Sequence, residues 1–183
     1  MEEKLLQPAG PCRIAVTGPE STGKSVLAES LALHYHTVWV PEYARTYLKD
    51  LDRPYHYEDI LKIAMGQLQS ENTAAENATG ILFCDTELIV TKIWSEFKYG
   101  KCDPWIPEQI NQHPHDLYLL CDIDLPWEFD PLREHPGHRK DLFRLYVKEL
   151  QSRNLNYGIV SGTGVTRLEN ALNIIKEKLK IKV

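Results

Sequence analysis

An eight-residue segment near the N-terminus, GPESTGKS at residues 18–25, has the pattern G-x-x-x-x-G-K-[ST]. An apolar run at residues 13–17 precedes it, and a helix-like stretch follows it. Glycines in such a segment allow the backbone to curl until several N–H groups point at one anion, and the next helix adds the positive end of its dipole. The sequence therefore predicts a phosphate-binding loop (P-loop) between a buried strand and a helix.

Two side chains of this loop have roles that follow from their chemistry. Lys24 would reach the β- and γ-phosphates of ATP as a point charge, and the Ser25 hydroxyl would complete the shell of a Mg²⁺ ion. ATP and Mg²⁺ are thus the expected cofactors. We expect the nucleotide to contact the loop and the first residue of the helix, namely Gly18, Glu20, Ser21, Thr22, Gly23, Lys24, Ser25 and Val26.

Short apolar runs alternate with helix-like stretches along the chain. The runs are apolar on both faces, as in parallel strands that helices cover, and occupy residues 13–17, 38–40, 81–85, 117–122 and 157–161. Helical patterns occur near residues 24–34, 57–78, 86–99, 139–153 and 166–179. This order predicts a three-layer α/β P-loop NTPase fold with a five-stranded parallel sheet, in which ligands gather at the carboxyl ends of the strands.

The composition indicates which partners the chain is built for. The 183 residues, 43% hydrophobic and 26% charged, predict one soluble domain over residues 1–183. A net charge of −5 favours neither a nucleic acid nor an anionic membrane as partner, so local basic groups must neutralise any phosphate. Residues 1–8 lack the apolar stretch of a signal peptide and no run of ~18 apolar residues occurs, so we expect a cytoplasmic protein. Its partners are then small-molecule substrates, and a homo-oligomer is compatible with the sequence.

Asp85 ends the third apolar run, in the position of the second acidic element of P-loop proteins. A carboxylate there can hold Mg²⁺, or a water bound to it, opposite Ser25. The alternative is that Asp85 caps the helix expected to begin at Thr86, because strand-to-helix turns favour Asp for that reason alone. With the loop present, we favour the metal site, formed by Ser25 and Asp85.

Glu42 follows the second apolar run and opens the segment EYARTY. In a kinase this strand end faces the γ-phosphate, where a carboxylate could accept the proton of an acceptor hydroxyl. Equally, Glu42 could pair with Arg45 across one turn of an exposed helix. The residue types and their spacing leave both interpretations open.

Residues 125–140 form a long segment without periodicity that carries Arg133, Arg139 and Lys140. Loops of this length are uncommon unless they are functional or disordered. We expect a lid that brings arginines onto the transferred phosphoryl group, with Arg133 and Arg139 as catalytic candidates. Arg139 and Lys140 could instead be solvated charges in the first turn of the next helix.

Two further positions are candidates for contacts with flat rings. Trp127 lies in the lid segment, where an aromatic side chain stacks on a ligand ring or plugs the core. Thr163 lies in the triplet Gly162-Thr163-Gly164 after the last strand, which would make a tight turn beside the adenine base.

These motifs occur in an order that resembles the ribosylnicotinamide kinase domain of NadR-type proteins, in the P-loop kinase superfamily. The resemblance implies a fold like that of nucleoside and nucleotide kinases. It implies transfer of the ATP γ-phosphoryl group to the 5′-hydroxyl of nicotinamide riboside, giving nicotinamide mononucleotide. It also implies a catalytic set of Lys24, Glu42, Asp85, Arg133 and Arg139, and acceptor contacts from Glu42, Tyr43, Arg45, Asp85 and Trp127. The matching segments are residues 20–25, 42–47, 85–87 with Thr91, 126–127, 132–133 and 139–140.

The sequence departs from this family at the aromatic positions expected to sandwich the pyridine ring. Pro41 precedes Glu42, and the helix face that would carry the second ring has Gln67, Gln69 and Ser70. We expect a substitute among Trp39, Tyr43, Tyr47 and Trp127.

The sequence therefore constrains the identity of the phosphoryl acceptor less than that of the donor. Another small-molecule nucleoside, nucleotide or vitamin kinase is the first alternative, and a nucleotide-switched regulatory ATPase is an alternative of a different class. Either Glu42 or Asp85 could serve as the base.

Overall fold

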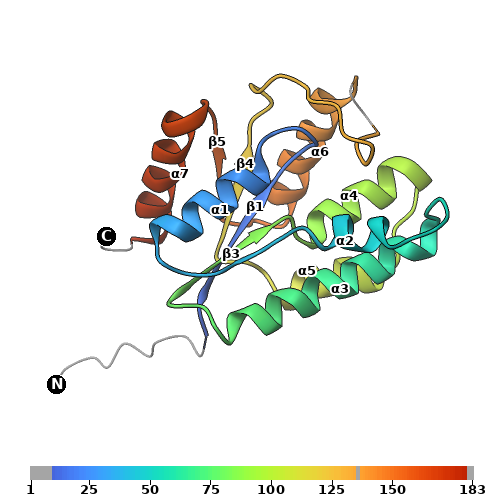
Figure 1. Cartoon of the computed structure of the whole chain (residues 1–183), viewed down its shortest axis with the longest axis horizontal. Coiled ribbons are helices and arrows are strands. Elements are labelled where there is room, and N and C mark those ends of the chain that lie inside the picture. The colour runs from blue at the N-terminus through green and yellow to red at the C-terminus, as the bar shows by residue number, and fades with distance from the viewer. Residues whose placement is uncertain (1–9, 135–136, 181–183) are drawn as a thin grey trace.

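The computed structural model describes residues 10–134 and 137–180. Residues 1–8, on which the expectation of a missing signal peptide partly rests, and residues 135–136 of the predicted lid lie outside the described residues. The centre of the molecule is a parallel sheet of five strands in the order β2-β3-β1-β4-β5, which confirms the predicted fold class (Figure 1). The strands are β1 (Cys12–Thr17), β2 (Trp39–Val40), β3 (Ile81–Asp85), β4 (Leu117–Cys121) and β5 (Tyr157–Val160).

Helices cover both faces of this sheet because its strands are apolar on both faces. Ile14 and Val16 of β1 point into one core with α1 and α7, whereas Ala15 between them points into a second core with α3, α4, α5 and α6. Figure 1 shows α1 and α7 together on one side of the sheet and α3, α4, α5 and α6 on the opposite side. The helices are α1 (Lys24–His34), α2 (Tyr43–Lys49), α3 (Tyr57–Ala75), α4 (Leu88–Tyr99), α5 (Trp105–Gln112), α6 (Arg139–Ser152) and α7 (Gly164–Leu179).

Two short helices, α2 and α5, were absent from the sequence-based prediction of elements. The seven residues of α2 carry a single buried side chain, Ala44, so they show no apolar period. The eight residues of α5 include Pro107, which the first helical turn tolerates because its missing N–H would have no partner there. Both elements are too short for hydrophobic periodicity to reveal them.

The start of α4 also differs from the prediction. Thr86 has a left-handed backbone (φ 67°), so the helix begins at Leu88 and not at Thr86. Glu87 is the N-cap residue, and its carboxylate accepts a hydrogen bond from the N–H of Ile89 at 2.6 Å. The capping role considered for Asp85 therefore belongs to Glu87.

The parallel arrangement brings the carboxyl ends of all five strands to one edge of the sheet. The P-loop follows β1, the central strand; on one side of it Glu42 follows β2 and Asp85 ends β3. Among the described residues, no helix combines the length and hydrophobicity needed to cross a bilayer.

Candidate active site

The P-loop takes its shape from residues with positive φ angles. Gly18 (φ 131°) and Gly23 (φ 73°) occupy conformations that side chains disfavour, and Ser21 (φ 55°) lies between them. A Cβ atom on Gly18 would lie 3.0 Å from the carbonyl oxygen of Cys121 on β4. Gly18 thus lets the loop leave β1 in close contact with the neighbouring strand.

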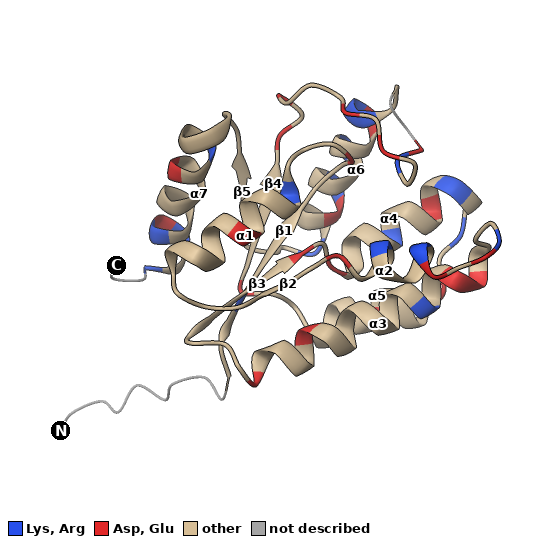
Figure 2. Cartoon of the chain, in the orientation of Figure 1, with Lys and Arg blue, Asp and Glu red and all other residues tan. Residues whose placement is uncertain are grey.

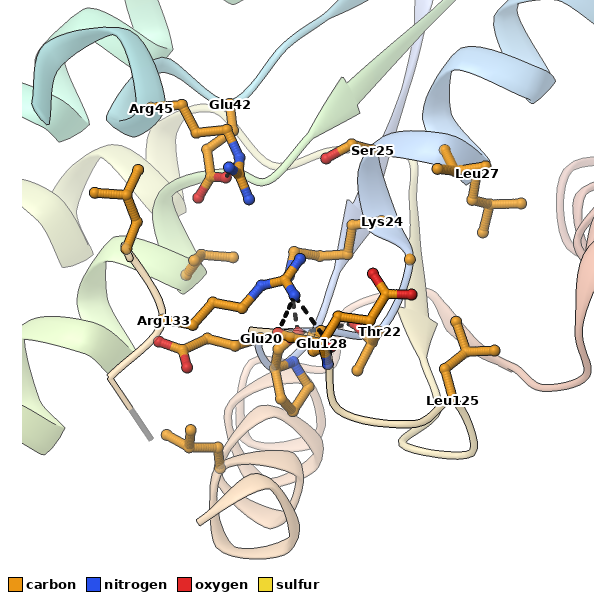
Figure 3. A pocket seen from close by; sticks show the side chains of 18 of the residues that line it. Glu20, Thr22, Lys24, Ser25, Leu27, Glu42, Arg45, Leu125, Glu128 and Arg133 are labelled. Carbon is orange, nitrogen blue, oxygen red and sulfur yellow. Dashed lines mark hydrogen bonds and ion pairs between the residues drawn. The ribbon is translucent and has the colours of Figure 1, made fainter. Parts of the chain in front are cut away.

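Lys24 and Thr22 both bond to the carbonyl oxygen of Pro19 inside the loop. The Lys24 ammonium donates to it at 2.8 Å, and the Thr22 hydroxyl donates to it at the same distance. The ammonium therefore lies across the loop, and Figure 3 shows the Lys24 side chain pointing into the cavity. A phosphate entering the loop would offer this cation a stronger, charged acceptor than the carbonyl.

Two arginines hold the outside of the loop. Arg167 of α7 is buried, and it donates to the carbonyl of Thr22 at 2.8 Å and to the carboxylate of Asp124 at 2.8 Å. Arg139 at the start of α6 donates to the carbonyls of Ser21 (3.0 Å) and Leu125 (2.9 Å). Sequence reasoning missed Arg167, because it lies 145 residues from its loop partner and belongs to no motif.

The lid segment brings Arg133 to the mouth of the same loop. Its guanidinium donates to the Ser21 hydroxyl at 3.3 Å and to the carbonyl of Glu128, and it lies 6.0 Å from the centre of the Trp127 ring. Figure 2 shows that this segment carries both basic and acidic residues. Arg133 lines the cavity beside Lys24 but Arg139 does not, so the structure separates the two arginines named as catalytic candidates (Figure 3).

Asp85 lies at the end of β3 with 1% of its surface exposed. Burial raises the pKa of this carboxyl to about 6, although Lys24 and a hydrogen bond from Ser25 lower it in part. Its Oδ1 atom is buried without a hydrogen-bond partner. An unpaired carboxylate oxygen next to a serine hydroxyl fits the oxygen shell that Mg²⁺ prefers, so Ser25 and Asp85 could hold the ion.

Glu42 and Arg45 lie across the cavity from the loop. Their side chains form an ion pair at 3.1 Å, and Arg45 also pairs with Asp130 of the lid at 2.9 Å. Both residues line the cavity, and Figure 3 shows their side chains pointing toward Lys24 and Arg133. Glu42 therefore pairs with Arg45 and also faces the P-loop across the cavity. Its role as a base stays a prediction.

One cavity of about 390 Å³ connects these groups. Its walls include all eight residues of the P-loop, and its aromatic lining comes from Trp94 and Phe97 of α4 and Tyr146 of α6. Asp85 lies beneath Ser25 and outside the lining. Of the predicted nucleotide contacts, Val26 lines the cavity, whereas Thr163 is exposed as the N-cap residue of α7 and does not.

The aromatic residues expected near the acceptor lie elsewhere. Tyr43 covers Gly66 of α3 so closely that a Cβ there would lie 2.1 Å from the ring, and the Tyr47 hydroxyl donates to Asp59 at 2.8 Å. Trp39 packs against the core beneath α1, and Trp127 lies next to Arg133. None of these four residues lines the cavity.

A five-stranded parallel sheet with a P-loop after its central strand, an acid at the end of β3 and an arginine-bearing segment at the mouth of the loop defines a P-loop domain of the kinase type. The AAA_28 family model, described as an AAA domain, matches residues 13–167. The chain belongs to this family.

Two curated relatives share substantial sequence with the chain. It is 31% identical over 150 residues to the trifunctional NAD biosynthesis/regulator protein NadR of Salmonella typhimurium, and equally to that of Escherichia coli. The alignments cover 79% of this chain and 37% of each relative. The chain thus spans little more than a third of the length of these relatives.

Solved structures show the same fold. A NadR protein in complex with NR superposes with a TM-score of 0.81 at 24% identity, over 94% of this chain and 53% of that one. A NadR protein in complex with NAD and AMP-PNP gives 0.79 at 22% identity, over 94% and 51%. Deoxyadenosine kinase from M. mycoides gives 0.64 at 13% identity, over 90% and 99%. The chain shares its fold with the matched half of the NadR proteins and with a nucleoside kinase.

Proposed function

We propose that this protein is an ATP-dependent kinase that phosphorylates the 5′-hydroxyl of nicotinamide riboside to give nicotinamide mononucleotide. The observation that carries the proposal is one continuous cavity in which a P-loop lysine, Lys24, faces a carboxylate, Glu42, across the space between two strand ends. The similarity to NadR and the NadR complexes with NR and with AMP-PNP support this acceptor and this donor.

Phosphoryl transfer requires positioning and charge neutralisation more than covalent chemistry, and the site supplies both. The loop N–H groups and Lys24 would hold the β- and γ-phosphates, and Arg133 would meet the γ-phosphoryl oxygens from the lid. Ser25 and Asp85 would hold Mg²⁺, which neutralises charge on the phosphates when bound. Glu42 would orient the acceptor hydroxyl and accept its proton.

The charges that line the cavity favour a nucleoside over a nucleotide as acceptor. An acceptor phosphate would need cations beyond those that serve ATP. Among the described lining residues the further cations are Arg45, which pairs with Glu42 and Asp130, and Arg167, which pairs with Asp124 and loop carbonyls. The Glu42 carboxylate beside Arg45 would also repel an acceptor phosphate.

The test is a panel of acceptors assayed for ADP release with Mg-ATP: nicotinamide riboside, uridine, thymidine, deoxyadenosine, nicotinamide mononucleotide, pantothenate and thiamine. We expect kcat/KM for nicotinamide riboside to exceed every other value by at least about tenfold, with nicotinamide mononucleotide detected as product by mass. Lys24→Ala serves as the inactive control. A larger kcat/KM for another acceptor would reassign the substrate, and ADP release independent of every acceptor would favour a regulatory ATPase.

A further inference from the structure

The cavity has an apolar side that the phosphate chemistry does not use. Helices α4 and α6 form it, and the spacing of its members places them on one face of each helix. We name this surface the α4–α6 wall. It consists of Val90, Ile93, Trp94 and Phe97 from α4, and Leu142 and Tyr146 from α6.

Two rings of the α4–α6 wall retain accessible surface. Ile93, Leu142 and Tyr146 are buried, but Trp94 and Phe97 are only half-buried while they line the cavity. The contacts that an acceptor ring could make on this side therefore come mainly from Trp94 and Phe97.

Neighbouring aromatic side chains fix the orientation of these two rings. The Trp94 Nε1–H donates to the Tyr55 hydroxyl at 2.9 Å, and the two rings meet at 66° with centroids 5.0 Å apart. Phe97 meets the His138 ring at 61° and 5.6 Å. Rings held in this way lose little conformational entropy when a ligand ring binds against them.

Among the described residues, no aromatic side chain of α2 or α3 lines the cavity. Gln67 of α3 is committed to structural contacts: its side-chain oxygen accepts from the N–H of Tyr43, and its nitrogen donates to Glu71 and to the carbonyl of Thr86. The Tyr43 ring is packed against Gly66. Neither Gln67 nor Tyr43 therefore offers a surface on which a ligand ring could stack. The aromatic surface of the cavity lies on α4 and α6.

We infer that the α4–α6 wall is the subsite for the planar base of the acceptor and that Trp94 and Phe97 determine its specificity. The inference rests on the proposed function. No residue of the wall carries a charge, so it suits a flat ring without anionic substituents, and its aromatic faces attract a cationic ring such as a pyridinium. A nucleoside whose base lies on this wall shares one cavity with Lys24 and Glu42, into which its sugar hydroxyl can extend.

The experiment measures KM for nicotinamide riboside and KM for ATP separately in Trp94→Ala and Phe97→Ala. A ring that stacks on the base should raise the acceptor KM about tenfold or more in each variant, with the ATP KM changed less than about twofold. Trp94→Phe keeps a ring but loses the hydrogen bond to Tyr55, and should stay within about threefold of the wild type. Trp105→Ala is the control. Trp105 is a half-buried ring that packs against the same hydrophobic core as Trp94 and Phe97 but does not line the cavity, so this variant shows the effect of lost core packing alone. Thermal unfolding with and without Mg-ATP shows that each variant folds and binds the donor.

The possible outcomes separate the wall inference from the proposed function. If the wild type phosphorylates nicotinamide riboside and both alanine variants keep the wild-type KM for it, the wall inference is wrong and the proposed function stands. If the wild type phosphorylates none of the panel, the proposed function fails. Calorimetric titration of nicotinamide riboside in the presence of Mg-ADP then decides the wall inference: binding to the wild type that weakens in both variants supports it, and undetectable or unchanged binding overturns it.

Discussion

Arg133 and Arg139 both donate hydrogen bonds to the phosphate-binding loop, but they lie in different positions relative to the cavity. Arg133 lines the cavity and donates to the Ser21 hydroxyl and the Glu128 carbonyl, whereas Arg139 lies outside the lining and donates to the carbonyls of Ser21 and Leu125. A guanidinium in the cavity can follow charge as it redistributes on a phosphoryl group. A guanidinium outside the cavity that bonds to a loop carbonyl fixes the shape of the loop.

The first prediction uses this difference. Arg133→Ala should lower kcat by about 10²-fold or more while the affinity for ATP falls much less, because arginine contacts to a transferred phosphoryl group act mainly in the transition state. Arg139→Ala should instead lower the free energy of unfolding by about 1–3 kcal/mol, because two carbonyls lose a charged donor. Steady-state kinetics and chemical denaturation on both variants check the assignment. An unchanged kcat in Arg133→Ala would place this residue outside the reaction.

The second prediction concerns the base. Glu42→Gln keeps the shape of the side chain and one hydrogen-bonding oxygen but loses the proton acceptor, so phosphoryl transfer should fall by about 10²–10⁴-fold. Loss of the partly exposed ion pair with Arg45 should cost at most about 1 kcal/mol of stability. The measurement is single-turnover transfer at saturating Mg-ATP. Wild-type transfer in this variant would leave Asp85 as the carboxylate to test.

Much of the site could be predicted at this scale because its parts are local in sequence. The loop at residues 18–25 has a recognisable local pattern, Glu42 closely follows one apolar run, and Asp85 ends another. Arg167, Trp94 and Phe97 carry no such signal, since only tertiary packing brings a residue of α7 or α4 to the loop.

At the scale of the elements, a buried polar cluster joins α3 to the loop before β4. The His115 Nε2 atom lies 3.3 Å from a carboxylate oxygen of Glu71, and both side chains are buried. Burial by itself lowers the pKa of His115, but the charge and hydrogen bond of Glu71 outweigh it, so the pKa is raised. This pair links elements that are 44 residues apart in sequence without belonging to the cavity.

The third prediction follows from the sign of this shift. A raised pKa in the folded state means that the pair stabilises the fold fully below the ordinary histidine pKa of about 6.5, and that this contribution is lost as the pH rises through the folded-state value. The free energy of unfolding should therefore decline as the pH rises from the ordinary histidine pKa through the higher folded-state value. His115→Gln and Glu71→Gln should each be less stable at low pH and have a flatter profile. Equal slopes in wild type and variants would contradict the assignment.

The elements differ in how clearly the sequence reveals them. All five strands could be predicted because each lies in an apolar run, and the central strands β1, β3 and β4 are buried on both faces; long helices with a buried stripe are equally visible. The start of α4 could not, because it depends on the left-handed Thr86 and on a side-chain cap from Glu87. Strand order was also beyond the sequence, since pairing between β1 and β4 joins segments about a hundred residues apart.

For the whole molecule, the fourth prediction is that Mg-ATP stabilises the fold. A ligand at 100 times its Kd adds about 2.7 kcal/mol to the free energy of unfolding, which raises Tm by about 5–10 °C in a domain of this size. ATP without Mg²⁺ should give a smaller shift, because Asp85 and the phosphates then repel each other. Without nucleotide, the free energy of unfolding of Lys24→Ala should lie within about 1 kcal/mol of the wild-type value. Mg-ATP should raise the Tm of this variant only weakly. A wild-type Tm that Mg-ATP leaves unchanged would contradict the donor site.

The bond from Arg167 to the carbonyl of Thr22 also has a consequence for biosynthesis. Chains emerge from the ribosome N-terminus first, at about 5–20 residues per second, so the loop at residues 18–25 is synthesised long before the helix that holds it. Arg167 lies on α7, which packs against α1 directly behind the loop. A nascent chain that ends before α7 therefore carries the complete loop sequence without the contact that fixes its backbone. We expect nucleotide binding to be acquired late in synthesis, when α7 docks.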